Sequence, residues 1–221
     1  MHRASSVIIA GVLAVAVLGG CQTVTTGPTE VGSGTTASED RTVGDFSQVA
    51  VSSSVRADVR IGTPAAVRVT ADDNLLDNVR TVVGGGKLEV GVDGSITTKT
   101  PIVVEITVPS LTLAAASSTA QLSATGVAGE SLRVVSESSG TVEVDGSVSA
   151  LEVRADSAGI ARLGELAADS ATVELASAAH AWIHVSGTVS GSVESASILS
   201  LVGQPGEVEV ETDSAGQVVT E

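Results

Sequence analysis

Aromatic side chains are nearly absent from this chain of 221 residues, which contains one Phe, one Trp and no Tyr. Aromatic rings usually fill much of a protein core, so a core here must be built from Val, Ile, Leu and Ala. The hydrophobic content of 43% is too high for a disordered chain. The 24 glycines, together with abundant Ser and Thr, disfavour long helices. The composition therefore predicts an all-β fold with many tight turns.

Basic residues are also scarce, with 11 Lys and Arg against 26 Asp and Glu and a formal net charge of -15. No Lys or Arg follows Arg162, whereas acidic residues continue as far as Glu221. A surface of this charge repels phosphate groups, which excludes nucleic acid as a partner. The C-terminal end is the acidic end of the chain.

Cysteine occurs once, at Cys21, so an internal disulfide is excluded. The residues before it have the order of a secretory leader: a basic start at Arg3, an apolar run over 7–18 and the small pair Gly19-Gly20. The apolar run has 12 residues, and a membrane-spanning helix needs about 20. This shortness disfavours a permanent transmembrane helix.

The segment Leu18-Gly19-Gly20-Cys21 resembles the lipobox of bacterial lipoproteins. The resemblance implies a signal peptide over 1–20, cleavage before Cys21 and lipidation of its thiol. Lipid chains hold a protein on a membrane without crossing it, so we expect an extracytoplasmic protein anchored to the cell membrane or an outer membrane. An ordinary signal peptide or an uncleaved anchor, with Cys21 incidental, is the alternative.

Residues 21–43 are rich in Thr, Gly, Ser and Glu and offer almost nothing to bury, which predicts a flexible tether of about 25 Å. Over 44–110, apolar residues then alternate with polar ones in short strands separated by turn residues. One exception is 72–79, where Asp and Asn precede apolar residues and favour a single helical turn that they cap. A standard calcium loop needs Gly at its sixth and Glu at its twelfth position, where Asp77 and Val83 stand.

From 111 to 221 the chain repeats itself. Small-residue turns followed by a strand recur at intervals of 20, 19, 21, 19 and 17 residues. A fixed period of this length is typical of a solenoid, in which equivalent apolar positions stack from coil to coil. We therefore predict a right-handed parallel β-helix with coils of about 20 residues, and a β-sandwich is the alternative. The predicted stacked interior residues are Leu122, Val142, Val144, Leu163, Leu175, Leu201 and Val210.

The segments 44–49, 67–76 and 85–90, together with the Ser/Ala/Gly repeats after Leu111, resemble the bacterial head GIN domain of auto-transporter adhesins. The similarity runs from Gly44 to Glu221. It implies a right-handed β-helical domain built from two portions, an N-terminal β portion over 44–110 and a repeat portion over 111–221. It further implies a lipoprotein leader and no enzymatic activity.

His180, Trp182 and His184 alternate along one predicted strand, so their side chains share one face. If Ala181 and Ile183 point inward, these three residues form a contact patch on the outer face. The alignment of the repeats instead places Trp182 inward as a core residue. A metal site needs a third ligand, and no further His or Cys is available beyond the anchoring cysteine, so no metal is predicted.

The sequence shows no cluster of acidic and basic residues that would indicate an active site, and the only Lys or Arg residues of the repeat portion are Arg133, Arg154 and Arg162. No Ser-His-Asp order, phosphate-binding loop or zinc spacing occurs, so no enzyme and no cofactor are expected. The sequence favours a lipid-anchored, non-catalytic binding or adhesion module for an envelope, matrix or protein ligand. The alternative is a structural or sensory envelope component that docks a basic partner protein through its acidic face.

Overall fold

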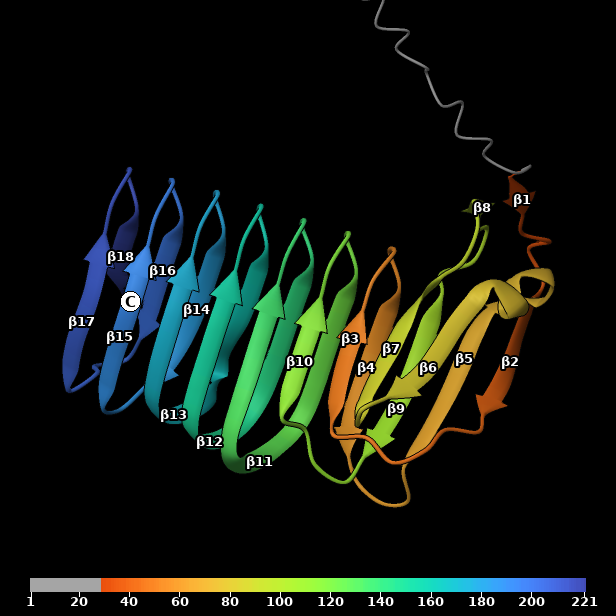
Figure 1. The fold of residues 1–221 in the computed structure, drawn as a ribbon, viewed down its shortest axis with the longest axis horizontal. Coiled ribbons are helices and arrows are strands. Elements are labelled where there is room, and N and C mark those ends of the chain that lie inside the picture. The colour runs from red at the N-terminus through yellow and green to blue at the C-terminus, as the bar shows by residue number, and fades with distance from the viewer. Residues whose placement is uncertain (1–28) are drawn as a thin grey trace, which may run out of the picture.

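The computed structural model describes residues 29–221, which are nearly all β. The chain winds as a right-handed parallel solenoid whose strands lie side by side along the long axis (Figure 1). Leu122 pairs with Val142 of the next coil, and Val142 pairs with Ala161 of the one after, which gives coils of about 20 residues. The predicted β-helix is therefore confirmed against the alternative of a sandwich.

Each coil has two flat faces. We call one the Trp182 face. In spatial order its strands are β2 (Thr36–Arg41), β5 (Ala66–Asp72), β9 (Val103–Val108), β4 (Arg56–Ile61), the first parts of β11 (Gln121–Ser136), β12 (Thr141–Ala155) and β13 (Ile160–Leu175), and then β14 (His180–Val185), β16 (Ile198–Val202) and β18 (Gln217–Thr220). From β4 onward these strands follow the tight turns drawn along the upper edge of Figure 1, and β2, β5 and β9 extend the face at the N-terminal end.

We call the other the Arg154 face. In spatial order its strands are β6 (Val79–Gly84), β7 (Lys87–Val92), β3 (Gln48–Val51), β10 (Leu113–Ala116), the second parts of β11, β12 and β13, and then β15 (Thr188–Val193) and β17 (Glu207–Thr212). From β3 onward these strands precede the same turns, and β6 and β7 extend the face at the N-terminal end. The two predicted portions meet where β3 and β4 pair with β10 and β11, respectively. They therefore share one core.

The tight turns use two successive residues with positive φ, and none of these residues is glycine. In the coil of β12 and β13 they are Ser157 (φ 52) and Ala158 (φ 60). Such a backbone costs L-residues energy, roughly 1–2 kcal/mol each. A ladder between coils compensates, because each turn donates an N–H to the next one, as Ala158 does to the carbonyl of Ser177 at 2.9 Å.

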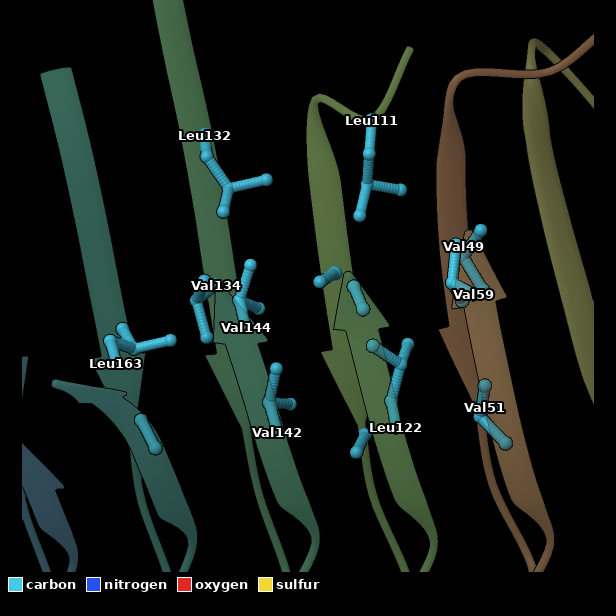
Figure 2. Packing of buried hydrophobic residues seen from close by; sticks show 14 of the residues in the cluster. Val49, Val51, Val59, Leu111, Leu122, Leu132, Val134, Val142, Val144 and Leu163 are labelled. Carbon is cyan, nitrogen blue, oxygen red and sulfur yellow. The ribbon is translucent and has the colours of Figure 1, made fainter. Parts of the chain in front are cut away.

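The core consists of inward-pointing aliphatic residues stacked from coil to coil, with Leu122, Val142, Val144 and Leu163 among those drawn in Figure 2. Six of the seven predicted interior residues are buried. Val210 is the exception, since it is only half-buried in the last strand of the Arg154 face. It pairs with Gly191 on one side, and no described strand covers its other side.

The N-terminal end of the solenoid is closed by a cap. Strand β2 pairs antiparallel with β5, and the short strands β1 (Glu30–Val31) and β8 (Ile96–Thr97) pair beside it. The prediction of a flexible tether over 21–43 is therefore wrong for the residues of β1 and β2. The composition of this segment gave no sign of β1 and β2, because these strands bury almost nothing and form only by pairing with distant segments.

Asp72 lies at the centre of this cap and is fully buried. Its carboxylate accepts hydrogen bonds from the backbone N–H groups of Gly34 (2.9 Å), Lys99 (2.8 Å) and Thr100 (3.3 Å). Burial alone would raise the pKa of Asp72, but these three N–H donors outweigh it and lower the pKa below its ordinary 3.8. Asp72 thus ties three separate segments together as a carboxylate.

The predicted helical turn over 72–79 is confirmed as the 3-10 helix η1 (Asp73–Asn78). The expected N-cap is absent, because the Asp72 side chain makes no capping hydrogen bond to this helix. Asn74 instead accepts a hydrogen bond from the N–H of Ser33 at 2.7 Å. The polar residues of this turn therefore bind the N-terminal segment rather than their own helix.

The leader, its cleavage site and Cys21 lie outside the described residues. Among residues 29–221, no helix is long and apolar enough to cross a membrane.

Candidate functional site

The outer surface of the Trp182 face is interrupted along one line. Three successive strand pairs shift register at equivalent places, between Ala124 and Val127, between Glu143 and Gly146, and between Leu163 and Ala167. Bulges of this kind bend a strand and redirect its side chains, and they are frequent beside functional sites. Because the shifts fall in neighbouring coils, they mark a line on which a continuous hollow lies.

This hollow, which we call the bulge groove, has a volume of about 440 Å³. A volume of this size is within the range of small-ligand sites. The lining residues that carry chemistry are Glu143, Asp145, Arg162, Glu165 and Trp182, with Val202 supplying an apolar patch.

The polar side chains of the groove come from one repeated coil position. Ser123 pairs with Glu143, Glu143 with Arg162 and Arg162 with Trp182, so the four stand in one row across neighbouring strands. Asp145 adds a second row and accepts a hydrogen bond from the N–H of Gly126 at 2.7 Å. The groove therefore combines one guanidinium, several carboxylates and one indole.

Trp182 faces outward, because Ala181, Ile183 and Val185 are the buried residues of β14. The outer-face alternative for Trp182 is therefore correct, and the inward placement is wrong. His180 stacks on the indole with ring centroids 3.5 Å apart and an interplanar angle of 23°. His180 Nε2 lies 3.2 Å from the hydroxyl of Ser200. The indole thus lines the groove on one side and is stacked by His180.

Desolvation by burial lowers the pKa of His180 below its ordinary 6.5, and Glu221 opposes this shift. At neutral pH the ring is therefore uncharged. A neutral imidazole stacks on the indole without bringing a cation to the groove.

His184 does not join the other two members of the predicted patch. It is exposed and lines a separate hollow of about 270 Å³ with Ser147, Ser149, Asp169 and Ser186. Among residues 29–221, no group of three His, Asp or Glu side chains is arranged as metal ligands.

Sequence reasoning identified Trp182 but missed Glu143 and Arg162 as its neighbours. The signal was present, since Ser123, Glu143, Arg162 and Trp182 follow one another at the coil period. The bulge beside these residues could not be predicted from the sequence, because the register shift arises only when adjacent coils pair.

The fold and the groove define a class of protein: a capped, two-faced β-solenoid that carries a ligand-sized hollow on its outer surface. Residues 45–205 match the family model described as "Putative auto-transporter adhesin, head GIN domain", and the chain belongs to this family. The family resemblance predicted from the sequence is thereby confirmed. No curated protein matches the chain.

Solved structures share this fold. One is a "putative adhesin" from Bacteroides fragilis, with a TM-score of 0.70 and 15% identity, where the match covers 86% of this chain and 99% of that one. Another is a "putative lipid binding protein" from Parabacteroides distasonis, with a TM-score of 0.55, 16% identity and coverage of 88% and 100%. A third is a "putative adhesin" from Parabacteroides merdae, with a TM-score of 0.57 and 15% identity, where the match covers 86% of this chain and 98% of that one. At these identities the likeness concerns the fold alone.

Proposed function

We propose that this protein is a lipid-anchored, non-catalytic binding module of the cell envelope, and that the bulge groove is its ligand contact site. The observation that carries the proposal is the position of Trp182. The only tryptophan of the chain stands on the outer surface, in a groove with Arg162 and three carboxylates, rather than in the aliphatic core. Exposed tryptophan and arginine are the residues that most often dominate binding energy at interfaces.

The chemistry of the groove favours a ligand with a ring or apolar side that packs on the indole and polar groups that reach its neighbours. Arg162 donates, whereas Glu143 and Glu165 accept. The non-catalytic part of the proposal rests on exposure. Enzymes hold a catalytic acid in an apolar pocket so that it keeps its proton, and Glu143 and Glu165 are both exposed.

The proposed anchor is the lipidated Cys21, which follows the leader 1–20 and places the module at the cell membrane or an outer membrane. The family description as an adhesin supports a surface location. The anchor is testable by itself. Cys21→Ala, produced as the full chain in a host that processes lipoproteins, should move the protein from the membrane fraction to the soluble fraction or leave the leader uncut. Unchanged membrane association with a cleaved leader would refute the anchor.

The groove is tested by display of the full chain on cells and measurement of their retention on immobilised glycans and matrix proteins. Trp182→Ala should weaken binding roughly tenfold or more if the indole is a central contact. Val135→Ala is the matched control, since Val135 is a half-buried apolar residue on the opposite face. If both variants bind as the wild type does, the bulge groove is not the contact site.

A further inference from the structure

The two ends of the solenoid differ in how their last strands are covered. At the C-terminal end, β17 pairs only with β15 and β18 only with β16 among the described residues. Val208 is 45% exposed and Val219 is 42% exposed. Val208 pairs with the fully buried Val189 of the coil before it, so it continues an interior column that no described strand covers.

The direction of the backbone groups at this edge can be assigned. Glu207 donates its N–H to Gly187 at 3.3 Å, and Asp213 donates to Val193 at 3.2 Å. Alternate residues of a parallel strand bond to opposite neighbours, so Val208 and Val210 direct their N–H and C=O groups to the free edge.

Strand β18 follows the same rule. Gln217 donates its N–H to Ser197 and Glu221 donates to Leu201, each at 3.0 Å. Val218 and Thr220 therefore face the free edge. The end of the solenoid thus offers two edge strands, one on each face, whose outward backbone groups pair with no described residue, beside an uncovered apolar rung.

The charge of this end narrows the choice of partner. Glu207, Glu209 and Glu211 alternate with the valines of β17, and no Lys or Arg follows Arg162. A second copy stacked on this edge with its own C-terminal end would place acidic strands against each other, which is unfavourable.

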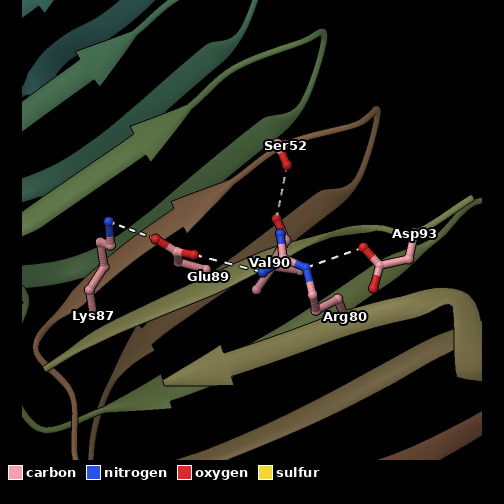
Figure 3. A network of polar contacts seen from close by, with 6 residues as sticks. All are labelled: Ser52, Arg80, Lys87, Glu89, Val90 and Asp93. Carbon is pink, nitrogen blue, oxygen red and sulfur yellow. Dashed lines mark hydrogen bonds and ion pairs between the residues drawn. The ribbon is translucent and has the colours of Figure 1, made fainter. Parts of the chain in front are cut away.

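The N-terminal end of another copy offers little positive charge in exchange: among the described residues of the cap, Lys99 has no carboxylate partner and donates to the carbonyl of Ser33 at 3.3 Å, but the arginines nearby are paired. Figure 3 shows Arg80 between Glu89 and Asp93, with Arg80–Glu89 and Arg80–Asp93 distances of 3.7 and 3.3 Å. Arg68 is likewise paired with Asp40 at 2.7 Å. Arg68 and Arg80 are therefore already paired with their own neighbours, and Lys99 by itself does not balance the glutamates of β17.

We propose that the C-terminal edge formed by β17 and β18 is a docking site for an extended segment of a basic partner protein, which adds a strand to the solenoid. Strand addition supplies main-chain hydrogen bonds, and side chains of alternating character supply specificity. A segment that alternates Lys or Arg with aliphatic residues places its cations beside the glutamates and its aliphatic residues over the open valine column. This site is separate from the bulge groove.

The test uses the full chain and two short synthetic peptides, one alternating Lys with Val and one alternating Glu with Val. The Lys/Val peptide should slow hydrogen exchange at the amides of Val208, Val210 and Val218, and its affinity should fall several-fold when the salt concentration is raised. The Glu/Val peptide should do neither. A Lys/Val peptide that leaves these amides unprotected overturns the proposal.

Two variants locate the contact. Glu209→Lys combined with Glu211→Lys should reverse the preference, so that the Glu/Val peptide binds better than the Lys/Val peptide. Val210→Pro removes an edge N–H that no described strand uses, and it should weaken Lys/Val binding several-fold. Trp182→Ala is the matched control and should leave peptide binding unchanged, which separates this proposal from the groove.

Three further outcomes each overturn the inference. A scrambled peptide of the same composition that protects the same amides equally well would show attraction by charge without strand addition. Self-association of the chain that protects β17 without any peptide would make a second copy the occupant. If the double lysine variant unfolds or keeps the wild-type preference while Val210→Pro binds normally, the edge is not the contact.

Discussion

The two ends of the solenoid solve the same physical problem in different ways. A coil can bury its apolar side only against a neighbour, so the first and last coils each have one open side. At the N-terminal end, β2, η1 and the loop over 98–100 cover this side, and Asp72 links the segment before β2 to this loop. At the C-terminal end, acidic residues beside the valines of β17 keep the edge hydrated. Charged residues on an edge strand also discourage self-association.

This contrast indicates that local stability is graded along the solenoid. Middle coils are covered on both sides, the N-terminal cap is held in part by one buried carboxylate, and within residues 29–221 the last coil is covered on one side only. Substitutions at these three places measure the gradient.

The largest effect is expected in the middle of the stack. Leu163→Ala removes a fully buried side chain and should lower the free energy of unfolding by about 2–5 kcal/mol through the cavity that it leaves. Val210→Ala should cost less, about 1 kcal/mol, because it removes fewer carbon atoms and Val210 is only partly buried in the last rung. Urea denaturation of both variants measures the difference. Equal losses would show that the last coil is packed as tightly as the middle ones.

A smaller effect is expected at the cap. Asp72→Asn replaces a carboxylate that accepts three N–H groups by an amide that presents a donor to one of them. Because the pKa of Asp72 is lowered in the folded state, its contribution is present above the ordinary pKa of 3.8 and is lost as the pH falls through the lower folded value. The variant should be less stable at neutral pH and should lose this part of the acid sensitivity.

The control for Asp72 is Asp77→Asn, which removes the same charge from an exposed position in the adjacent helix η1. Thermal unfolding between neutral pH and pH of about 3 separates the two residues. A wild-type pH profile retained by Asp72→Asn would contradict the assigned role of the carboxylate.

The smallest expected effect is a gain in stability at one of the tight turns. Ala158 has a positive φ of 60°, which glycine adopts without a steric cost. Glycine relieves the strain of this backbone but also increases the entropy of the unfolded chain, which opposes the gain. Ala158→Gly should therefore raise the free energy of unfolding by a net amount of about 0.5 kcal/mol. Ala161→Gly, the same change in a buried strand, should instead destabilise. Calorimetry of the pair would reject the strain argument if both variants lost stability.

Much of the fold could be predicted because it depends on periodicity. The coil length, the interior positions from Leu122 to Leu201 and the small-residue turns all repeat, and repetition is visible in a sequence. The errors lie where the pattern is broken by contacts between distant segments. Strand β2 looked like linker because only its pairing with β5 makes it a strand, and Asp72 looked like a helix cap because its partners Gly34 and Lys99 are far away in the chain.

The sequence by itself determined the solenoid, its period and its acidic C-terminal end, since these follow from composition and from residues that recur at a fixed spacing. Only the tertiary structure decided which way Trp182 points and what stands beside it. Register shifts in neighbouring coils hollow the outer face there, and such shifts depend on how adjacent strands fit together. The same reason applies to the two ends, because whether an edge is covered depends on which segment returns to it.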